Sequence, residues 1–482
     1  MISVPNHRLL LSGNNFLWIL GLVFLGWSSC TPLKSTAKPK PGVQIITPDK
    51  TPKPETKTQP EKSTPTPSHA TTKEVKISAV DTIHLIEKQE SVPPITVKPK
   101  KTTKYTEGLN LKSKYHIKLL LPLESNRGLV GGNQQRFVHF YAGVLKALEV
   151  LDDRGYKFTI DVIDTQEGTY KVNANVSNIL SDSTDLIIGP FERDDVKLIS
   201  EEAKKKGIPV MSPWQTSTKI TLENPWYIQL KPNLKEHFVK LAEVCSKEFN
   251  EGEVAIVGIN NKETNAWINY FQESIKKKRG QSSKNFFTTY FVTNDSLINA
   301  PSAFYRLFSN PKIKAVLLPN YSFNDEDFVY QVLRKLMAEK GNNPLVVYGM
   351  PLLIESEKID FDFYHALNMR IVTSDYIDLN TSEIREFRRQ FLNIYGEIPL
   401  QDALKGYAVM MLAGESLTDY GTNFQSYIAN KDISYLQTIF NIQKATSENF
   451  ENDTTVRDAL DYYENKHLDI IEFKGTGFVK RY

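Results

Sequence analysis

The sequence predicts an α/β fold built on parallel sheets, and residues 185–217 carry the clearest evidence. Leu186–Ile188 are a short apolar run, typical of a parallel strand that is buried on both faces. Gly189-Pro190 ends that strand, because proline cannot donate to a ladder. The helical pattern that follows begins with acids and ends with lysines, as the helix dipole prefers. Gly207 closes the helix before the next apolar run at 208–211, so the segment is predicted to be one βαβ unit.

The same alternation of strand and helix patterns precedes this unit. Apolar runs at 116–123 and 158–164 predict two strands, and each is followed by a helical pattern, at 136–153 and 170–180. The helix at 136–153 places its apolar residues on one face. Repeated alternation of this kind requires a parallel sheet with right-handed crossovers.

A second alternating run follows an extended, proline-bounded stretch at 224–233. Strands are predicted at 254–259, 286–292, 315–319 and 345–350, with helices at 234–249, 264–279, 301–309 and 325–339. Because this run has enough elements for a sheet of its own, it predicts a second lobe. The chain then has an extended stretch at 369–378, helices at 381–395 and 402–418, and a glycine-punctuated hairpin at its end.

The N-terminus carries a targeting pattern. Residues 16–27 form an apolar run preceded by a single base, Arg8, and the run has the length of a signal-peptide core rather than of a bilayer span. Ser28-Ser29-Cys30 follow, and the pattern resembles a bacterial lipoprotein signal in which Cys30 becomes the lipidated first residue. We therefore expect a signal peptide at 1–30 and a lipid-anchored protein in the periplasm or cell envelope, at the outer membrane. An uncleaved anchor with an incidental cysteine is the alternative.

Residues 31–112 are predicted to be a disordered tether. They hold 15 lysines and 8 acidic residues, a net charge of +7, and they contain twelve of the 25 prolines. Such a segment cannot bury enough apolar surface to offset the entropy of ordering it. With Arg8 also subtracted from the total of +3, the remaining residues carry a net charge of −5.

The sequence shows no set of residues that suggests catalysis or a cofactor. The eight histidines are scattered without metal-ligand spacing, and neither a nucleophile elbow nor a phosphate-binding loop is present. The neighbouring acids Asp194 and Asp195 begin a helix, so capping and solvation explain them. Cys245 lies in a helical pattern and is expected to be a small buried hydrophobe. We expect no enzyme activity, no cofactor, no metal and no nucleic-acid partner.

Several motifs together resemble a known family. They are IKLLLPL, Tyr141-Ala142-Gly143, Asp164, IIGPF, GIPVMSPWQTST, PWYIQLKPN, VAIVGIN, LVVYGM and Gly406-Tyr407. Their order is similar to that of the type 1 periplasmic binding-protein family, the branched-chain amino-acid receptor group, over residues 115–482. The resemblance implies two Rossmann-like lobes joined by a three-strand hinge. It implies lobe 1 at 113–231 and 374–445, and lobe 2 at 232–373 and 446–482.

The family fold also implies a ligand at the carboxyl ends of the strands, between the lobes. Thr216 matches a Ser/Thr of the family's loop after the fourth strand, where Trp214 adds bulk, and Tyr321 matches an aromatic residue of the second lobe. The expected cleft residues are Ser125, Phe191, Glu192, Trp214, Gln215, Thr216, Asn260, Tyr321 and Met350. Trp214 and Tyr321 have two alternative roles: each could stack on a ligand in the cleft or pack against its own lobe.

Two positions depart from the amino-acid-binding pattern. Met350 stands where an acid for the ligand's ammonium group is expected, with Glu355 the nearest carboxylate, and Glu192 would repel a ligand carboxylate. We expect a non-catalytic binding protein for a small polar solute, with an amino-acid-like ligand and an ABC-transporter permease as candidates. The alternative is a regulatory or structural envelope lipoprotein that binds a protein partner such as a peptidoglycan synthase.

Replacing Cys30 tests the anchor. Cys30→Ala removes the sulfur that would carry the lipid, so the full chain should move from the membrane fraction to the soluble fraction after cell breakage. Cys245→Ala is the control and should leave the membrane fraction unchanged. Equal membrane retention of both variants would show that the lipoprotein prediction is wrong.

Overall fold

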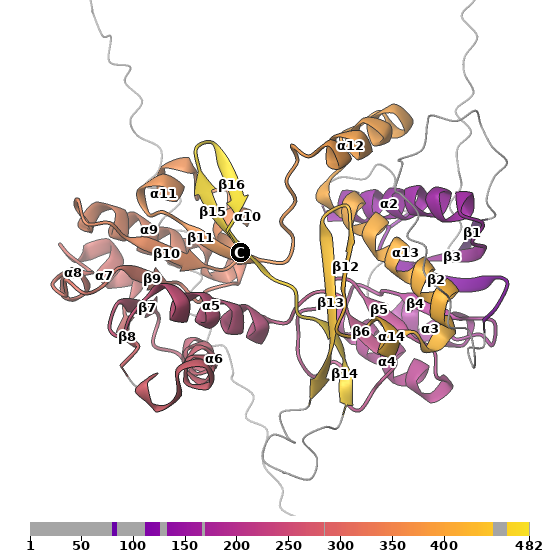
Figure 1. The fold of residues 1–482 in the computed structure, drawn as a ribbon, viewed down its shortest axis with the longest axis horizontal. Coiled ribbons are helices and arrows are strands. Elements are labelled where there is room, and N and C mark those ends of the chain that lie inside the picture. The colour runs from indigo at the N-terminus through magenta and orange to yellow at the C-terminus, as the bar shows by residue number, and fades with distance from the viewer. Residues whose placement is uncertain are drawn as a thin grey trace, which may run out of the picture. The chain divides into compact units, whose positions relative to one another are not determined.

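The computed structural model describes residues 80–83, 111–125, 133–165, 169–283, 285–446 and 460–481. They form two lobes, each an α/β unit with helices on both faces of its sheet, which confirms the predicted fold class (Figure 1). Cys30 and most of the expected tether lie outside the described residues. Among the described helices, none has the length and apolar character that a membrane span needs.

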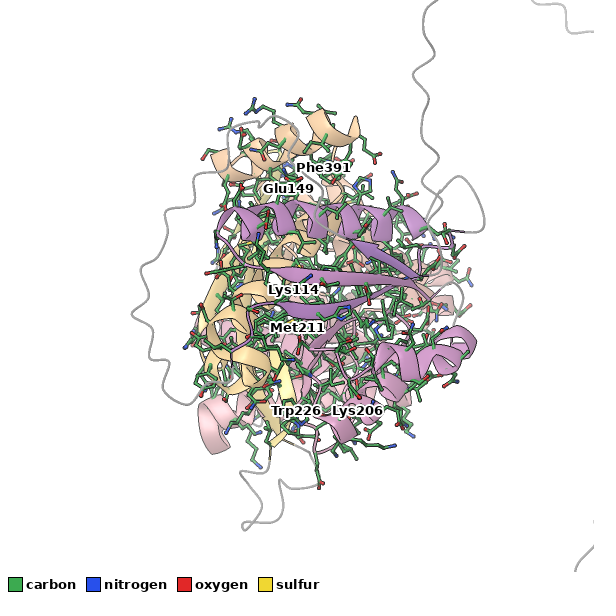
Figure 2. All side chains as sticks on the ribbon, turned by 90° about the vertical axis from the view of Figure 1, so that its right-hand side faces the viewer. Lys114, Glu149, Lys206, Met211, Trp226 and Phe391 are labelled. Carbon is green, nitrogen blue, oxygen red and sulfur yellow. The ribbon has the colours of Figure 1, made fainter. Side chains whose placement is uncertain are left out.

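Lobe 1 is a nine-stranded sheet in the order β1-β3-β2-β4-β5-β6-β14-β13-β12. Its central strands, β3-β2-β4-β5-β6-β14 in sheet order, are parallel to one another. The strands are β1 Val80–Ile83, β2 Tyr115–Leu121, β3 Phe158–Asp164, β4 Leu186–Ile188, β5 Val210–Ser212, β6 Tyr227–Gln229, β12 Asp432–Tyr435, β13 Thr438–Thr446 and β14 Leu460–Asn465. The helices are α2 Asn133–Asp153, α3 Thr169–Ile179, α4 Arg193–Lys206, α12 Ser382–Tyr395, α13 Gln401–Tyr420 and α14 Gln425–Ile428, with the 3₁₀ turn η3 Gly421–Asn423. Glu149 on α2 and Phe391 on α12 mark one side of the sheet, and Lys206 at the end of α4 marks the other (Figure 2).

Two boundaries differ from the sequence prediction. Residues 80–83, expected in the tether, pair antiparallel with β3 and extend the edge of the lobe 1 sheet. The return to lobe 2 was expected at 446, but β14 still belongs to lobe 1, because it pairs with β6 and β13. Both segments are strands that join the lobe 1 sheet through backbone hydrogen bonds to strands far away in the sequence. The order of apolar runs along the chain does not reveal such pairing.

Lobe 2 is a seven-stranded sheet in the order β16-β15-β11-β10-β9-β7-β8. Its strands are β7 Val254–Gly258, β8 Phe287–Phe291, β9 Ala315–Leu317, β10 Val346–Gly349, β11 Arg370–Thr373, β15 Asp469–Lys474 and β16 Gly477–Lys480. Its helices are α5 Leu234–Glu248, α6 Lys262–Arg279, α7 Asn294–Asn299, α8 Tyr305–Phe308, α9 Glu326–Glu339, α10 Leu352–Glu355 and α11 Phe361–Ala366, with the 3₁₀ turns η1 Gly280–Ser283 and η2 Phe323–Asp325. Cys245 of α5 is fully buried and unpaired, as the sequence predicts.

The chain crosses between the lobes three times, which confirms the three-strand hinge. The crossings follow β6, β11 and β14. Hydrogen bonds tie the first crossing to the third: Asn233 Nδ2 donates to Glu464 Oε2 at 2.6 Å, and Asn465 Nδ2 donates to the Leu230 carbonyl at 3.1 Å. Buried polar side chains that bond one another in this way fix the relative path of the two segments.

An ion cluster ties the first crossing to the second. Asp375, after β11, lies 3.2 Å from Lys231 Nζ of the first crossing and 3.1 Å from Lys405 Nζ of α13. Burial raises the pKa of Asp375, but the Lys405 and Lys231 charges outweigh that effect and hold the pKa well below its usual range. The carboxylate is therefore ionised at neutral pH.

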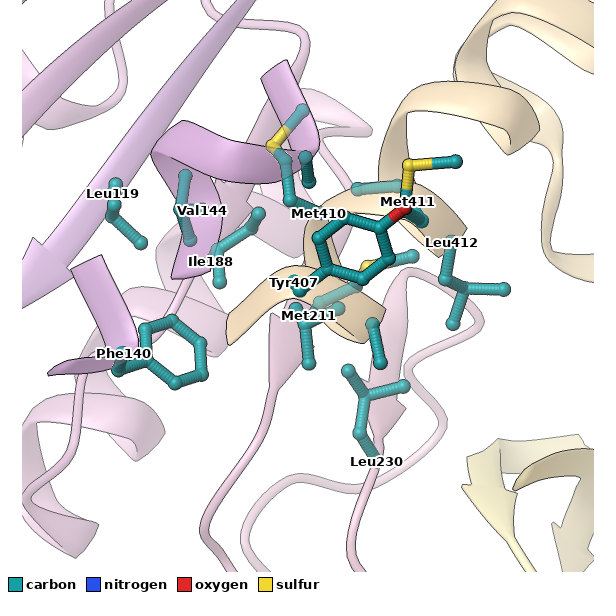
Figure 3. Close-up of a cluster of buried hydrophobic side chains, with 14 of the residues drawn as sticks. Leu119, Phe140, Val144, Ile188, Met211, Leu230, Tyr407, Met410, Met411 and Leu412 are labelled. Carbon is teal, nitrogen blue, oxygen red and sulfur yellow. The ribbon is translucent and has the colours of Figure 1, made fainter. Parts of the chain in front are cut away.

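Two glycines let α2 and α13 pack with their backbones in contact. A Cβ on Gly143 would lie 1.9 Å from the Ala403 carbonyl oxygen, and a Cβ on Gly406 would lie 2.0 Å from the Phe140 carbonyl oxygen. Around this contact, α2, α13 and the strands enclose the lobe 1 core, in which Phe140, Tyr407 and Met410 are buried (Figure 3). The motifs Tyr141-Ala142-Gly143 and Gly406-Tyr407 thus have a packing cause.

Adding one methyl group at this crossing should destabilise lobe 1. Gly143→Ala and Gly406→Ala force the helices apart, because backbone atoms cannot yield as a side chain does, and each should lower the free energy of unfolding by about 1–3 kcal/mol or more. Gly477→Ala is the control, since nothing lies within 4 Å of its added Cβ, and its effect should stay near zero. Urea unfolding of the three variants measures the difference, and a neutral Gly406→Ala would contradict the packing.

Candidate functional site

The carboxyl ends of β2, β4 and β5 lie along one edge of the lobe 1 sheet, because these strands are parallel neighbours. Ser125 follows β2 there. Its backbone N–H and its hydroxyl donate to Asp164 Oδ2 at 2.8 and 2.7 Å, and Leu123 N donates to Asp164 Oδ1 at 3.0 Å. Asp164, at the end of β3, therefore holds the start of this loop. In this structure Ser125 already has its hydrogen-bond partner.

An aromatic cluster packs at the same edge, where β4 and β5 end. The Trp214 ring lies 4.8 Å from that of Phe140, 5.6 Å from that of Phe137 and 5.8 Å from that of Phe191, measured between centroids. Trp214 is only 8 % exposed. Of the two alternatives, stacking on a ligand and packing against its own lobe, the structure therefore shows the second. Its Nε1 is buried without a hydrogen-bond partner.

The loops after β4 and β5 are joined and leave two polar side chains at the surface. Gln215 Nε2 donates to the Phe191 carbonyl at 2.6 Å. Glu192 is exposed and Thr216 is partly exposed. The structure thus brings Phe191, Glu192, Trp214, Gln215 and Thr216 together, as their places after parallel strands imply.

Arg136 belongs to this edge and was missed in the sequence. Its guanidinium lies 5.8 Å from the centroid of the Phe191 ring, and its Nη2 donates to Asp402 Oδ1 at 3.3 Å. Its Nε is buried and has no hydrogen-bond partner among the residues that the structure describes. A signal was present: Arg136 stands in the first turn of α2, where the helix dipole disfavours a cation and where this helix has no acid.

The corresponding edge of lobe 2 is mainly aromatic and amide-bearing. Tyr321 is 45 % exposed and its ring packs edge-on against Trp267, with centroids 5.2 Å apart. Phe323 next to it is 57 % exposed. Asn260 is exposed and accepts a hydrogen bond from Asn265 at 3.2 Å. These side chains are accessible from the solvent at the ends of β7 and β9.

Met350 does not fit the expected role. It is fully buried in the core between α5, α6 and the lobe 2 sheet, so its side chain cannot reach a ligand at the edge. Glu355, at the end of α10, is exposed, and its charge contributes to the raised pKa of Lys231, behind the larger effect of Asp375. Glu355 is therefore close enough to Lys231 for its charge to act on that lysine.

Asp195 is the most unusual charged residue at this edge. It lies in the first turn of α4, is fully buried, and has no hydrogen-bond partner on either carboxylate oxygen. Burial, with smaller contributions from Glu192 and Asp194, raises its pKa to about 6. The sequence-based explanation by capping and solvation is wrong for Asp195, because the side chain neither caps the helix nor meets solvent. It holds for Asp194, which is exposed.

Neutralising Asp195 should stabilise the protein above pH 6. The folded pKa of Asp195 exceeds the unfolded value, so its contribution to stability is lost as the pH rises from about 4 to about 6. Asp195→Asn removes this penalty and should raise the free energy of unfolding at pH 7 by about 1–3 kcal/mol, with no gain near pH 4. Asp194→Asn is the matched control. Urea unfolding as a function of pH measures both, and a loss of stability in Asp195→Asn at pH 7 would contradict the assignment.

Among the described residues, no group of three His, Cys, Asp or Glu side chains is arranged to hold a metal ion. The residues expected at the cleft lie on two sheet edges, which carry cationic, anionic, amide and aromatic side chains. Such a set can bind a polar or zwitterionic molecule through hydrogen bonds, ion pairs and ring contacts.

Comparison with known proteins agrees with this architecture. The sequence profile of a family described as "Periplasmic binding protein" matches residues 122–426. A putative branched-chain amino acid ABC transporter protein from Rhodospirillum rubrum has a TM-score of 0.54 at 16 % identity, covering 76 % of this chain and 100 % of that one. An ABC transporter substrate-binding protein from Desulfitobacterium hafniense, in complex with Leu, has a TM-score of 0.50 at 14 % identity with the same coverage.

No curated protein sequence matches the chain. At such identities the solved structures establish the fold alone, whereas the profile spans more than half of the chain. The chain belongs to the periplasmic binding protein family.

Proposed function

We propose that the protein is a non-catalytic binding protein of the cell envelope that closes its two lobes on a small polar solute. Lipid on Cys30 holds it at the outer membrane, and the solute passes to the permease of an ABC transporter. The solute is amino-acid-like, with a carboxylate and a second polar or charged group.

The observation that carries this proposal is the buried, unpartnered Nε of Arg136 beside Phe191. A buried N–H without an acceptor costs about 1–3 kcal/mol, and an incoming carboxylate would remove that cost. The exposed carboxylate of Glu192, next to Phe191, offers a partner for a ligand ammonium group. A zwitterion thus finds both of its counter-charges on lobe 1, and Tyr321 of lobe 2 offers a ring surface for its side chain.

The solved relatives support the solute class. One is a complex with Leu, and another is named as a branched-chain amino acid transporter protein. We infer that in this chain the acid for the ammonium group comes from lobe 1, because Met350 is buried and the charge of Glu355 already acts on Lys231.

A ligand panel tests the proposal directly. Thermal unfolding of the full chain is followed with each L-amino acid and with small carboxylic acids. A ligand present at 100 times its Kd should raise the stability by about 2.7 kcal/mol. Arg136→Ala and Glu192→Gln should each weaken binding of that ligand at least about tenfold, because each removes one counter-charge.

Arg389→Ala is the control, since Arg389 is a surface residue of α12 whose ion-pair partner among the described residues is Glu386 in its own helix. It should leave the Kd unchanged. If no compound of the panel shifts the melting temperature, the solute proposal is wrong.

The aromatic cluster favours a second candidate, a lipoprotein that binds a protein partner such as a peptidoglycan synthase. Trp214 and its neighbours fill the lobe 1 edge, and Tyr321 and Phe323 on lobe 2 expose the kind of rings that act as interface hot spots. Under this candidate, Tyr321→Ala/Phe323→Ala abolishes co-purification with purified synthases, whereas Arg136→Ala has little effect. The two candidates therefore predict opposite sensitivities.

A further inference from the structure

A groove on the flank of the hinge is separate from the two sheet edges. Its volume is about 770 Å³, within the range of ligand pockets. One wall consists of α5 and α6 of lobe 2, and the other consists of β13 and β14 of lobe 1, with the crossing after β14 between them (Figure 1). None of the residues expected at the cleft lines it, and neither does Arg136.

The groove is rich in lysine. Its described lining includes eight lysines and six acidic residues, and no arginine. Five of the six acids already have partners within the protein. They are Glu236 and Glu464, which share Lys466; Asp469, which pairs with Lys480; Glu243, which pairs with Lys247; and Asp461, whose carboxylate accepts from Glu223 N.

Four of the lysines have no ion-pair partner among the described residues. Lys240 on α5, Lys277 and Lys278 on α6, and Lys444 on β13 form no ion pair with any described residue, although the charges of Lys240 and Lys278 are felt by Glu243. Their ammonium groups come from both walls. Like charges collected around one concave surface raise the local concentration of an anion that fits it.

The choice of lysine indicates the kind of anion. An arginine fork fixes a single carboxylate or phosphate in one geometry, whereas a lysine ammonium acts as a mobile point charge. A wall of lysines therefore suits a flexible chain whose anionic groups repeat along its length. Because the two walls belong to different lobes, such a chain would also bridge the hinge.

We propose that this groove binds a linear polyanion that carries repeated phosphate or carboxylate groups. Lys277 and Lys278 contact it from lobe 2, and Lys444 contacts it from lobe 1. The proposal does not depend on the solute assigned to the sheet edges, because the two sites share no residue.

The test measures binding of fluorescently labelled polyphosphate and of labelled poly-L-glutamate to the full chain. Lys277→Ala/Lys278→Ala should weaken binding of at least one probe about tenfold at 0.1 M salt, with binding lost near 1 M salt because of screening. Lys444→Ala, on the opposite wall, should weaken it several-fold. The probe that responds distinguishes a phosphate polymer from a carboxylate polymer.

Lys276→Ala is the matched control, since Lys276 belongs to the same run of bases on α6 but does not line the groove. All variants keep residues 31–112, so any binding by that lysine-rich segment is common to them. Unchanged melting temperatures confirm that each variant is folded. An equal loss in Lys276→Ala, no effect of Lys444→Ala, or no binding of either probe would overturn the proposal.

Discussion

The two-lobed arrangement depends on the ion pairs that the carboxylate of Asp375 forms with two lysines. The carboxylate lies between Lys231 of the first crossing and Lys405 of α13, so one negative charge joins two crossings to the body of lobe 1. Removing either lysine would leave the partly buried carboxylate of Asp375 with one counter-charge fewer. The loss of stability would exceed what the ion pair itself contributes, because a buried charge without its partner is destabilising. The third crossing is fixed by amide and carboxylate bonds from Asn465 and Glu464. The hinge is therefore defined by polar contacts, while apolar packing defines each lobe.

The two candidate surfaces differ in the same way. The edge with Trp214 and Phe191 is aromatic, with single charges at its rim, and suits one small molecule or a defined protein contact. The flank of the hinge is lysine-lined within a folded body whose residues carry a net charge of −5. If the groove binds a polyanion as proposed, a basic groove on a net acidic body favours anions that fit the groove over anions that only approach the surface.

The sequence was sufficient for the elements whose apolar runs are long or doubly buried. The βαβ unit at 185–217 and both lobes follow from such runs. The family was indicated by a resemblance of motifs, two of which contain Gly143 and Gly406, the glycines that allow backbone contact. The predictions that were wrong concern strands whose pairing partners lie far away along the chain. Neither the pairing of β14 with β6 nor that of β1 with β3 leaves a periodic trace in the sequence.

The candidate site was predicted only in part, for a related reason. Loop positions after parallel strands identify which residues lie at the edge, so Phe191, Glu192 and Trp214 were found together. Position alone does not give the depth of a side chain. Met350 is buried beneath the edge and Asp195 lies inside it, and only the packing around them decides this.

The late position of β12 to β16 has a consequence for how the chain must be made. Asn465 bonds to Leu230, which is 235 residues earlier, so lobe 1 cannot complete its sheet until residue 465 has emerged. Until then β6 is an exposed edge strand, which is a template for wrong pairing between chains. The last strands of lobe 2, β15 and β16, arrive later still. Both sheets therefore need strands that lie after residue 459, and a chain cut before that point would leave β6 and β11 with unpaired edges at once.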